Sequence, residues 1–289
     1  MTGISGIPSE EADRLRSDAD GNVFGGVNAG GVGPNNYYDP VTGSALRNVF
    51  FGSNAGCGLN DGDDNILLGG FAGNCVGGGN FNVAIGCRAL GRCSLNGKSS
   101  TVAIGRGAGE CAQSSNSFFV GTGAGRSTTG DDNIFVGRCA GTGNISGGCN
   151  IFLGKYAGKE SIDKNHNFYA GQVAGQFAQG SRNVFIGQEA GRNSTDGEDN
   201  NFFGLNAGKF NSTGGSNNFM GRFAGCCNRT GSFNNYFGEC AGRVGLGTDN
   251  VFLGECAGRT SNGNDNNFIG NQAGENNTNC DNTFIGRYA

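Results

Sequence analysis

A nine-residue phrase recurs along this chain and constrains its fold more than any other feature. Its clearest copy is Asn183-Val-Phe-Ile-Gly-Gln-Glu-Ala-Gly191, whose positions we number one to nine. The glycine at position five marks sixteen copies between Gly26 and Gly286, and from Gly52 onward the copies are 16 or 17 residues apart, with one step of 19. A fixed period of this length predicts a stack of similar structural units.

Each phrase has the composition of a short strand followed by turns. Position one is Asn in fourteen copies, position three is aromatic in all but three, and position four is apolar after the first copy. Five β-prone residues bounded by glycine predict a strand. The glycine at position five and the Ala-Gly pair at positions eight and nine predict turns that need a small side chain or a positive φ.

The remaining seven or eight residues of each repeat are polar and rich in turn formers, and we expect a second, weaker strand and a second corner there. The predicted fold is therefore all-β. It is a parallel β-solenoid or β-roll of about sixteen rungs, in which successive rungs stack about 4.8 Å apart to form a rod.

Two columns of side chains are expected to hold the stack together. Position three should fill the interior with aromatic rings, namely Phe50, Phe119, Phe135, Phe152, Phe185, Phe202, Phe219, Phe252, Phe268 and Phe284. Position one should stack amide over amide, in a ladder that pairs buried polar groups and fixes the register. The ladder includes Asn48, Asn65, Asn133, Asn150, Asn183 and Asn250.

Positions three and four are both apolar, although neighbouring side chains of a strand point to opposite faces. One column can fill the interior, so the other needs cover from outside, because a monomer does not tolerate such a long apolar row. We favour self-association of three chains side by side or intertwined. In the alternative, local twisting fits both columns inside one roll.

The sequence suggests three segments. Residues 1–21 are polar, with a short helix expected at 10–20, and form an attachment or cap segment; a leader without regular structure is the alternative. Residues 22–47 hold a first rung with an inserted loop, and residues 48–289 form the regular array. The sixteenth phrase stops one glycine short, at Ala289, which suggests that a C-terminal piece is missing.

Composition excludes several classes of protein. Glycine is abundant, at 59 residues, but does not fall at every third residue, so the chain is not a collagen. A net charge of −4 with scattered cations gives no basic surface for nucleic acid. No apolar run is long enough for membrane insertion. The first ten residues also lack the features of a secretory signal.

No catalytic or metal-binding pattern stands out. The chain has twelve cysteines and one histidine but no Cys-x2-Cys pair, which argues against zinc. Cys240 and Cys256 share position seven on adjacent rungs, within reach of a disulfide. Because we expect the chain to be made in the cytosol, we favour the interpretation that the thiols stay reduced. The sequence does not point to a nucleophile, a base and an orienting group held together in one pocket. We therefore do not expect the chain to be an enzyme.

Acidic turns recur, and stacked carboxylates are ligands that Ca²⁺ accepts. They lie at 61–64, 131–132 and 196–199, and at Asp249 and Asp265. The Gly-Gly-x-Gly-x-Asp calcium repeat is missing. Solvated turn residues are the favoured interpretation, and no cofactor is expected.

The phrases Asn282-Thr-Phe-Ile-Gly286 and Asn82-Val-Ala-Ile-Gly86 resemble the repeats of the trimeric β-roll heads of trimeric autotransporter adhesins. They resemble even more the repeat arrays of bacteriophage tail-fibre and whisker-like proteins. The resemblance covers residues 22–289 and implies a homotrimeric, adhesive shaft. Phage members often carry a C-terminal chaperone for trimerisation, and this sequence shows none.

The sequence therefore predicts a viral structural protein, a tail fibre or whisker shaft of a bacteriophage. We expect it to be assembled in the host cytoplasm and carried on the virion, with residues 1–47 contacting other virion proteins. The shaft would support host attachment by contacting a surface glycan or protein. The alternative is a bacterial cell-surface adhesin or filament subunit, located outside the cell.

Overall fold

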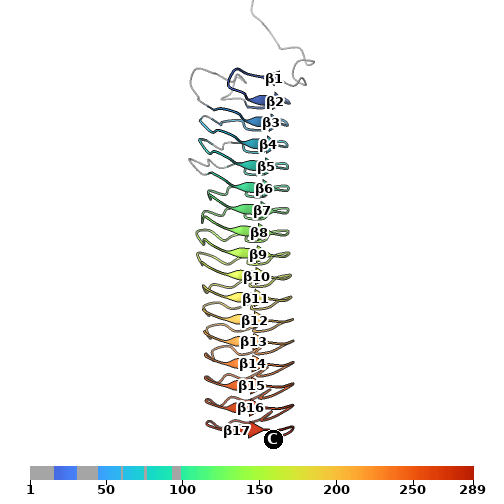
Figure 1. The fold of residues 1–289 in the computed structure, drawn as a ribbon, viewed down its shortest axis with the longest axis vertical. Helices are drawn as coiled ribbons and strands as arrows, with labels where there is room; N and C mark the ends of the chain where they lie inside the picture. The colour runs from blue at the N-terminus through green and yellow to red at the C-terminus, as the bar shows by residue number, and fades with distance from the viewer. Residues whose placement is uncertain (1–15, 31–44, 60, 75–76, 93–98) are drawn as a thin grey trace, which may run out of the picture. The chain divides into compact units, whose positions relative to one another are not determined.

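The structure, a computed structural model, describes residues 16–30, 45–59, 61–74, 77–92 and 99–289. The chain forms two units, Met1–Asn133 and Ile134–Ala289. No helix occurs among the described residues, and each unit is a stack of short parallel strands (Figure 1). The predicted all-β parallel β-solenoid is confirmed.

In the first unit, a two-residue strand precedes six strands of three residues each. The strand β1 (Arg16–Ser17) pairs antiparallel with β2, and β2 to β7 pair in parallel, each with the next. Their bounds are β2 Val23–Gly25, β3 Val49–Phe51, β4 Ile66–Leu68, β5 Val83–Ile85, β6 Val102–Ile104 and β7 Phe118–Val120.

The second unit has ten parallel strands, each again paired with the next along the chain. The register places equal phrase positions opposite each other, so Phe185 pairs with Phe202. The bounds are β8 Ile134–Val136, β9 Ile151–Leu153, β10 Phe168–Ala170, β11 Val184–Ile186, β12 Asn201–Phe203, β13 Asn218–Met220, β14 Asn235–Phe237, β15 Val251–Leu253, β16 Asn267–Ile269 and β17 Thr283–Ile285.

The prediction of a second strand in each repeat is wrong for the described residues, where each repeat contains one strand, at positions two to four. The polar half still bonds to the next rung, for example through Asn193 N–H to Lys209 O at 2.9 Å. Its glycines and positive-φ residues break the extended geometry, so the half forms stacked turns instead of a strand.

The helix expected at 10–20 is also wrong where the structure describes it. Residues 16–17 form β1, and the Asp18 carboxylate accepts hydrogen bonds from the backbone N–H groups of Asp20 and Asn22, at 3.0 and 2.8 Å. An Asx-type turn of this kind competes with helix. Residues 1–15 and 31–44, which hold most of the predicted attachment segment and inserted loop, lie outside the described residues.

The interior of each rung is narrow and is filled by positions three and eight. Phe185 and Ala190 are fully buried, as are their counterparts in neighbouring rungs. From Phe135 to Phe284 the rings stack with centroids 4.7–5.0 Å apart, which is the rung spacing. Phe284 is only half-buried because it belongs to β17, the last strand of this unit.

The glycines at positions five and nine are required for two different reasons. Gly69 has φ +129°, and a Cβ there would come within 2.7 Å of the carbonyl carbon of Gly86 on the next rung. Gly56, at position nine, has φ +65°, and a Cβ there would come within 2.6 Å of the Phe50 ring. The first glycine lets backbones approach closely, and the second makes room for the aromatic ring.

One repeat departs from the glycine rule because its interior differs. Leu90 occupies position nine of the rung whose position three is Ala84, and its side chain is 1% exposed. A Cβ on Gly109, in the next rung, would lie 2.6 Å from Leu90 Cδ2 and 3.6 Å from Ala103 Cβ. Leu90 therefore occupies the space that an aromatic ring fills elsewhere, which allows alanine at positions 84 and 103.

Candidate functional site

Each strand turns its central side chain inward and its two outer side chains away from the interior. In β9 the central Phe152 is fully buried, whereas Leu153 is 36% exposed. The same pattern holds along both units, so positions three and four do not share the interior. The alternative in which local twisting fits both columns inside one roll is wrong.

The exposed side chains at positions two and four form what we call the outer face of each unit. In the first unit both positions are apolar on β3 to β7, with Phe51, Ile66 and Phe118 each about two-fifths exposed. In the second unit, both are apolar on β8 to β11. Apolar side chains repeated on neighbouring rungs make a surface suited to association.

Further along the second unit, the outer face becomes half polar. Position two is Asn on β12, β13, β14 and β16, while position four stays apolar. The Nδ2 of Asn201 donates to Asn218 Oδ1, and that of Asn218 donates to Asn235 Oδ1, both at 2.8 Å. This outer amide ladder was not predicted, although Asn at position two is present in four of the repeats.

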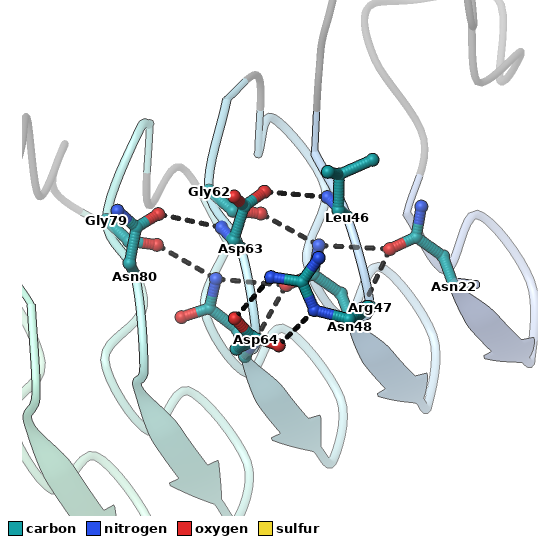
Figure 2. Close-up of polar contacts among 10 residues, drawn as sticks. Asn22, Leu46, Arg47, Asn48, Gly62, Asp63, Asp64, Gly79 and Asn80 are labelled. Carbon is teal, nitrogen blue, oxygen red and sulfur yellow. Dashed lines mark hydrogen bonds and ion pairs between the residues drawn. The ribbon is translucent and has the colours of Figure 1, made fainter. Parts of the chain in front are cut away.

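The ladder of position-one amides lies inside the rungs, where every predicted member is fully buried. Asn48 N–H donates to Asn22 Oδ1 at 2.8 Å, while Asn48 Nδ2 donates to the same oxygen and to Gly62 O (Figure 2). Most of these bonds therefore run from amide to backbone and only some from amide to amide. These bonds still give hydrogen-bond partners to buried polar groups, which would otherwise destabilise the fold.

A second polar ladder, which the sequence analysis did not anticipate, lies two residues before the first. Leu46 N–H donates to Asp63 Oδ1 at 2.8 Å, and Asp63 N–H donates to Asn80 Oδ1 at 2.7 Å (Figure 2). In this ladder the backbone of one rung donates to a side chain of the next rung. In the position-one ladder the backbone of the next rung donates to a side chain of the preceding rung, so where both ladders are present they join neighbouring rungs in opposite directions.

The same column continues through both units with other short polar residues. The accepting side chains are Asp63, Asn80, Ser99, Ser115, Asp131, Asn165, Ser181, Ser232, Thr248 and Asn264. The signal was a column rich in Asp, Asn, Ser and Thr, whose short side chains bond to nearby backbone. The exceptions in this column are Leu46, Gly148, Glu198, Gly215 and Cys280. Two of the predicted acidic turns thus contribute a carboxylate to this ladder, through Asp63 and Asp131.

Residues between the two ladders carry ion pairs across rungs. Arg47 forms a two-pronged pair with Asp64, both bonds at 2.7 Å, and this hydrogen bonding lowers the pKa of Asp64 (Figure 2). Arg182 pairs likewise with Asp199 and lowers its pKa, and it also contacts Glu198 at 2.6 Å. These exposed pairs contribute little stability individually.

The acidic turns are spread along the surface of the stack. Among the residues that the structure describes, no group of three or more His, Cys, Asp or Glu side chains lies close enough to hold a metal ion. Asp249 and Asp265 occupy the residue before position one, where φ is positive, at 58° and 56°. Asp and Asn tolerate that conformation better than most residues, which accounts for their enrichment there.

Cys240 and Cys256 occupy the same corner of adjacent rungs, and both thiols are free. The pKa of Cys256 is raised by burial first and by the neighbouring Cys240 second. Cys226 is more deeply buried, and burial raises the pKa of its thiol to about 12. Such thiols are poor nucleophiles at neutral pH.

No membrane-spanning helix, judged by length and hydropathy, occurs in the described part of the chain. Comparisons of the chain with protein-family models, with curated proteins and with solved structures found no match. The fold defines the chain as a β-solenoid repeat protein, and its most extensive candidate functional feature is the outer face.

Proposed function

We propose that this chain is a structural fibrous virion protein, the shaft of a bacteriophage tail fibre or whisker, assembled from three copies joined along their outer faces. The observation that carries the proposal is the outer face itself. On β8 to β11, both outward columns are apolar and partly exposed, as at Ile134 and Leu153.

Identical copies are a suitable cover for this face because they share its spacing. Paired strands in a parallel sheet lie about 4.8 Å apart, so a second copy presents apolar columns with the same repeat. Closed symmetric assemblies are the usual way in which such surfaces are buried. The choice of three copies rests on the resemblance to trimeric β-roll heads and phage fibres.

The outer amide ladder is compatible with the same assembly. Asn201, Asn218 and Asn235 bond to one another along the stack, so part of their hydrogen-bonding capacity is met before any partner arrives. Polar residues within an otherwise apolar interface are known to fix register and copy number in coiled coils. We propose that this row sets the alignment of the copies.

Placement on a virion, host attachment and an anchoring role for residues 1–47 are also part of the proposal. They rest on the repeat's resemblance to phage fibres. The second candidate, a bacterial cell-surface adhesin or filament subunit, is supported by the similar repeats of autotransporter adhesin heads.

The test is to raise antibodies against the purified chain and to locate them by immunogold electron microscopy, on phage particles and on uninfected cells of the source. The virion proposal expects gold on projecting fibres of the particles and none on uninfected cells. Gold on the surface of uninfected cells would overturn it in favour of the adhesin.

A further inference from the structure

We propose that the corner following β8 and β9 binds a tetrahedral oxyanion, phosphate or sulfate, either free or as an ester on a saccharide. The site consists of Arg138, Lys155, Tyr156 and Lys159, which we call the Tyr156 cluster. It lies outside the strands and so apart from the outer face, and the proposal is independent of the assembly proposed above.

Three cations converge on one aromatic ring in this cluster. The Arg138 Cζ lies 5.0 Å from the Tyr156 ring centroid, the Lys155 Nζ 5.3 Å and the Lys159 Nζ 5.7 Å. The Arg138 Nη2 also donates a hydrogen bond to the Tyr156 hydroxyl oxygen at 2.5 Å. The hydroxyl hydrogen is left free to donate to a ligand.

The fold brings these residues together through its stacked corners. Arg138 and Lys155 both occupy position six, on adjacent rungs, and Tyr156 N–H donates to Arg138 O at 3.0 Å. Tyr156 itself has φ 61°, at the corner where the chain turns. Two cations one rung apart repel each other, so an anion bound between them would relieve that repulsion.

The cluster carries more positive charge than its protein neighbours neutralise. Lys159 Nζ lies 3.2 Å from Glu160 Oε1, but neither Arg138 nor Lys155 has an acidic partner among the described residues. A net charge of −4 for the whole chain makes this local excess of cations unusual. Exposed cations with no protein partner are suited to an external anion.

A second corner offers a natural comparison because one of its two cations is already paired with an acidic side chain. Arg222 and Arg243 lie 5.4 and 5.2 Å from the Phe223 ring centroid, but Arg222 pairs with Glu239. Phe223 also has no hydroxyl. The Phe223 corner therefore shares the cation-and-ring geometry but has fewer cations, one of them paired, and lacks the additional hydroxyl donor.

The ligand chemistry follows from the donors present. A planar guanidinium, two ammonium groups and a phenol hydroxyl supply several N–H and O–H donors and no ionised acceptor, apart from the neighbouring Glu160. Oxygens of phosphate or sulfate form short, charge-assisted hydrogen bonds with such groups. Chloride offers no comparable set of directed acceptors.

The experiment uses the full chain with 3-fluorotyrosine in place of tyrosine, followed by ¹⁹F NMR, in which Tyr156→Phe assigns the Tyr156 signal. Inorganic phosphate and sulfate are titrated at constant ionic strength, with sodium chloride as the reference. We expect a saturable shift of the Tyr156 signal with either oxyanion and none with chloride. If glucose 6-phosphate binds more tightly than phosphate, the ligand is an ester. If it binds more weakly, the ligand is a free anion. Both results support the site.

Lys155→Gln and Arg138→Gln should each weaken phosphate binding by about two- to fivefold, the effect of removing one exposed charge partner. Arg222→Gln, at the Phe223 corner, should leave it unchanged. Circular dichroism spectra that match the wild type would show that the variants fold. The proposal is overturned if chloride shifts the signal equally, if both cluster variants bind phosphate as the wild type does, or if duplex DNA competes at lower phosphate-group concentration than either oxyanion.

Discussion

The Oδ1 of Asn183 accepts a hydrogen bond from the backbone N–H of Asn200, one rung further along the second unit, at 2.9 Å. The Nδ2 of the same amide donates to Gly197 O, also at 2.9 Å. One fully buried side chain thus pairs two backbone groups of the next rung, an acceptor and a donor. Repeated along the stack, this arrangement adds side-chain hydrogen bonds between rungs to the backbone bonds of the strands and turns.

Replacing Asn183 with Ala should therefore destabilise the second unit strongly. Two buried backbone groups would lose their partners, at about 1–3 kcal/mol each. Asn201→Ala is the matched control, because Asn201 is half-buried on the outer face, and it should cost less than 1 kcal/mol. Urea unfolding monitored by circular dichroism measures both. Equal midpoints for the two variants would contradict the role assigned to the buried ladder.

Two neighbouring glycines in the first unit should respond very differently to the addition of one methyl group. Gly69→Ala places a Cβ 2.7 Å from the Gly86 carbonyl carbon at φ +129°, so the backbones must separate. Gly70→Ala meets nothing nearer than 3.9 Å. We expect a loss of several kcal/mol for the first and about 1 kcal/mol or less for the second. Thermal unfolding of the two purified variants is the measurement, and similar melting temperatures would count against the close approach.

Because Leu90 fills the space that an aromatic ring fills in other rungs, the stability effects of substitutions at positions 90 and 103 should not be additive. Ala103→Phe alone would place a ring where Leu90 Cδ2 lies and should cost about 1–3 kcal/mol. Leu90→Gly alone leaves a cavity and should cost about 2–5 kcal/mol. Together they place a ring at position three of the rung that ends at Gly109 without a clash with Leu90, so the double variant should be more stable than the sum of the two losses predicts, by at least about 0.5 kcal/mol.

Chemical denaturation of the wild type, the two single variants and the double variant closes this cycle. Strict additivity would show that Leu90 does not replace the ring. A double variant that is less stable than additivity predicts would contradict the packing description more strongly.

Two buried tyrosines predict a loss of stability at high pH. Burial raises the pKa of Tyr169 and Tyr236 well above the ordinary value of 10.0, because the apolar interior disfavours the phenolate. The folded chain then keeps protons that the unfolded chain releases, so this stability is complete below pH 10 and falls as pH rises beyond it.

Tyrosinate absorbance measured against pH tests this expectation. Both side chains should stay protonated above the ordinary tyrosine pKa of 10.0, until the chain unfolds. In the Tyr169→Phe and Tyr236→Phe double variant, the late titration should disappear and the alkaline loss of stability should become shallower. Ionisation of all tyrosines near pH 10 in the still-folded wild type would contradict their burial.

Most of the fold could be predicted from the sequence because its period is strict. The strand at positions two to four, the aromatic column and the buried Asn column follow from residues such as Phe185 and Asn183. The polar half could not be predicted with the same success. Its residues, such as Asp63 and Ser99, looked like solvated turns, and only the stacking of rungs brings their side chains to backbone N–H groups.

Leu90 shows a second limit of the sequence pattern. Leu90 fits at position nine only because Ala84 and Ala103 carry no ring. The sequence pattern does not show that these three side chains share one space in the interior. The Tyr156 cluster has the same origin, because Arg138 is 18 residues away from Tyr156 and meets it only across the rung step.

Self-association through the outer face should depend on its apolar character. Leu153→Glu places a charge in the outward column of β9 and should shift the chain toward the monomer, since burying an unpaired charge is costly. Ile162→Glu is the matched control: Ile162 is 40% exposed and Leu153 36%, but Ile162 lies in the polar half of the rung. Sedimentation velocity compares the two variants. Equal association by both would mean that the outer face is not the interface.

The most direct test is the mass of the purified wild-type chain in solution, measured by multi-angle light scattering on a sizing column. Three copies of a 29.5 kDa chain are predicted, so the mass should be about three times that of the monomer. A monomer at all accessible concentrations would contradict the proposal that identical copies cover the outer face, and with it the trimeric fibre.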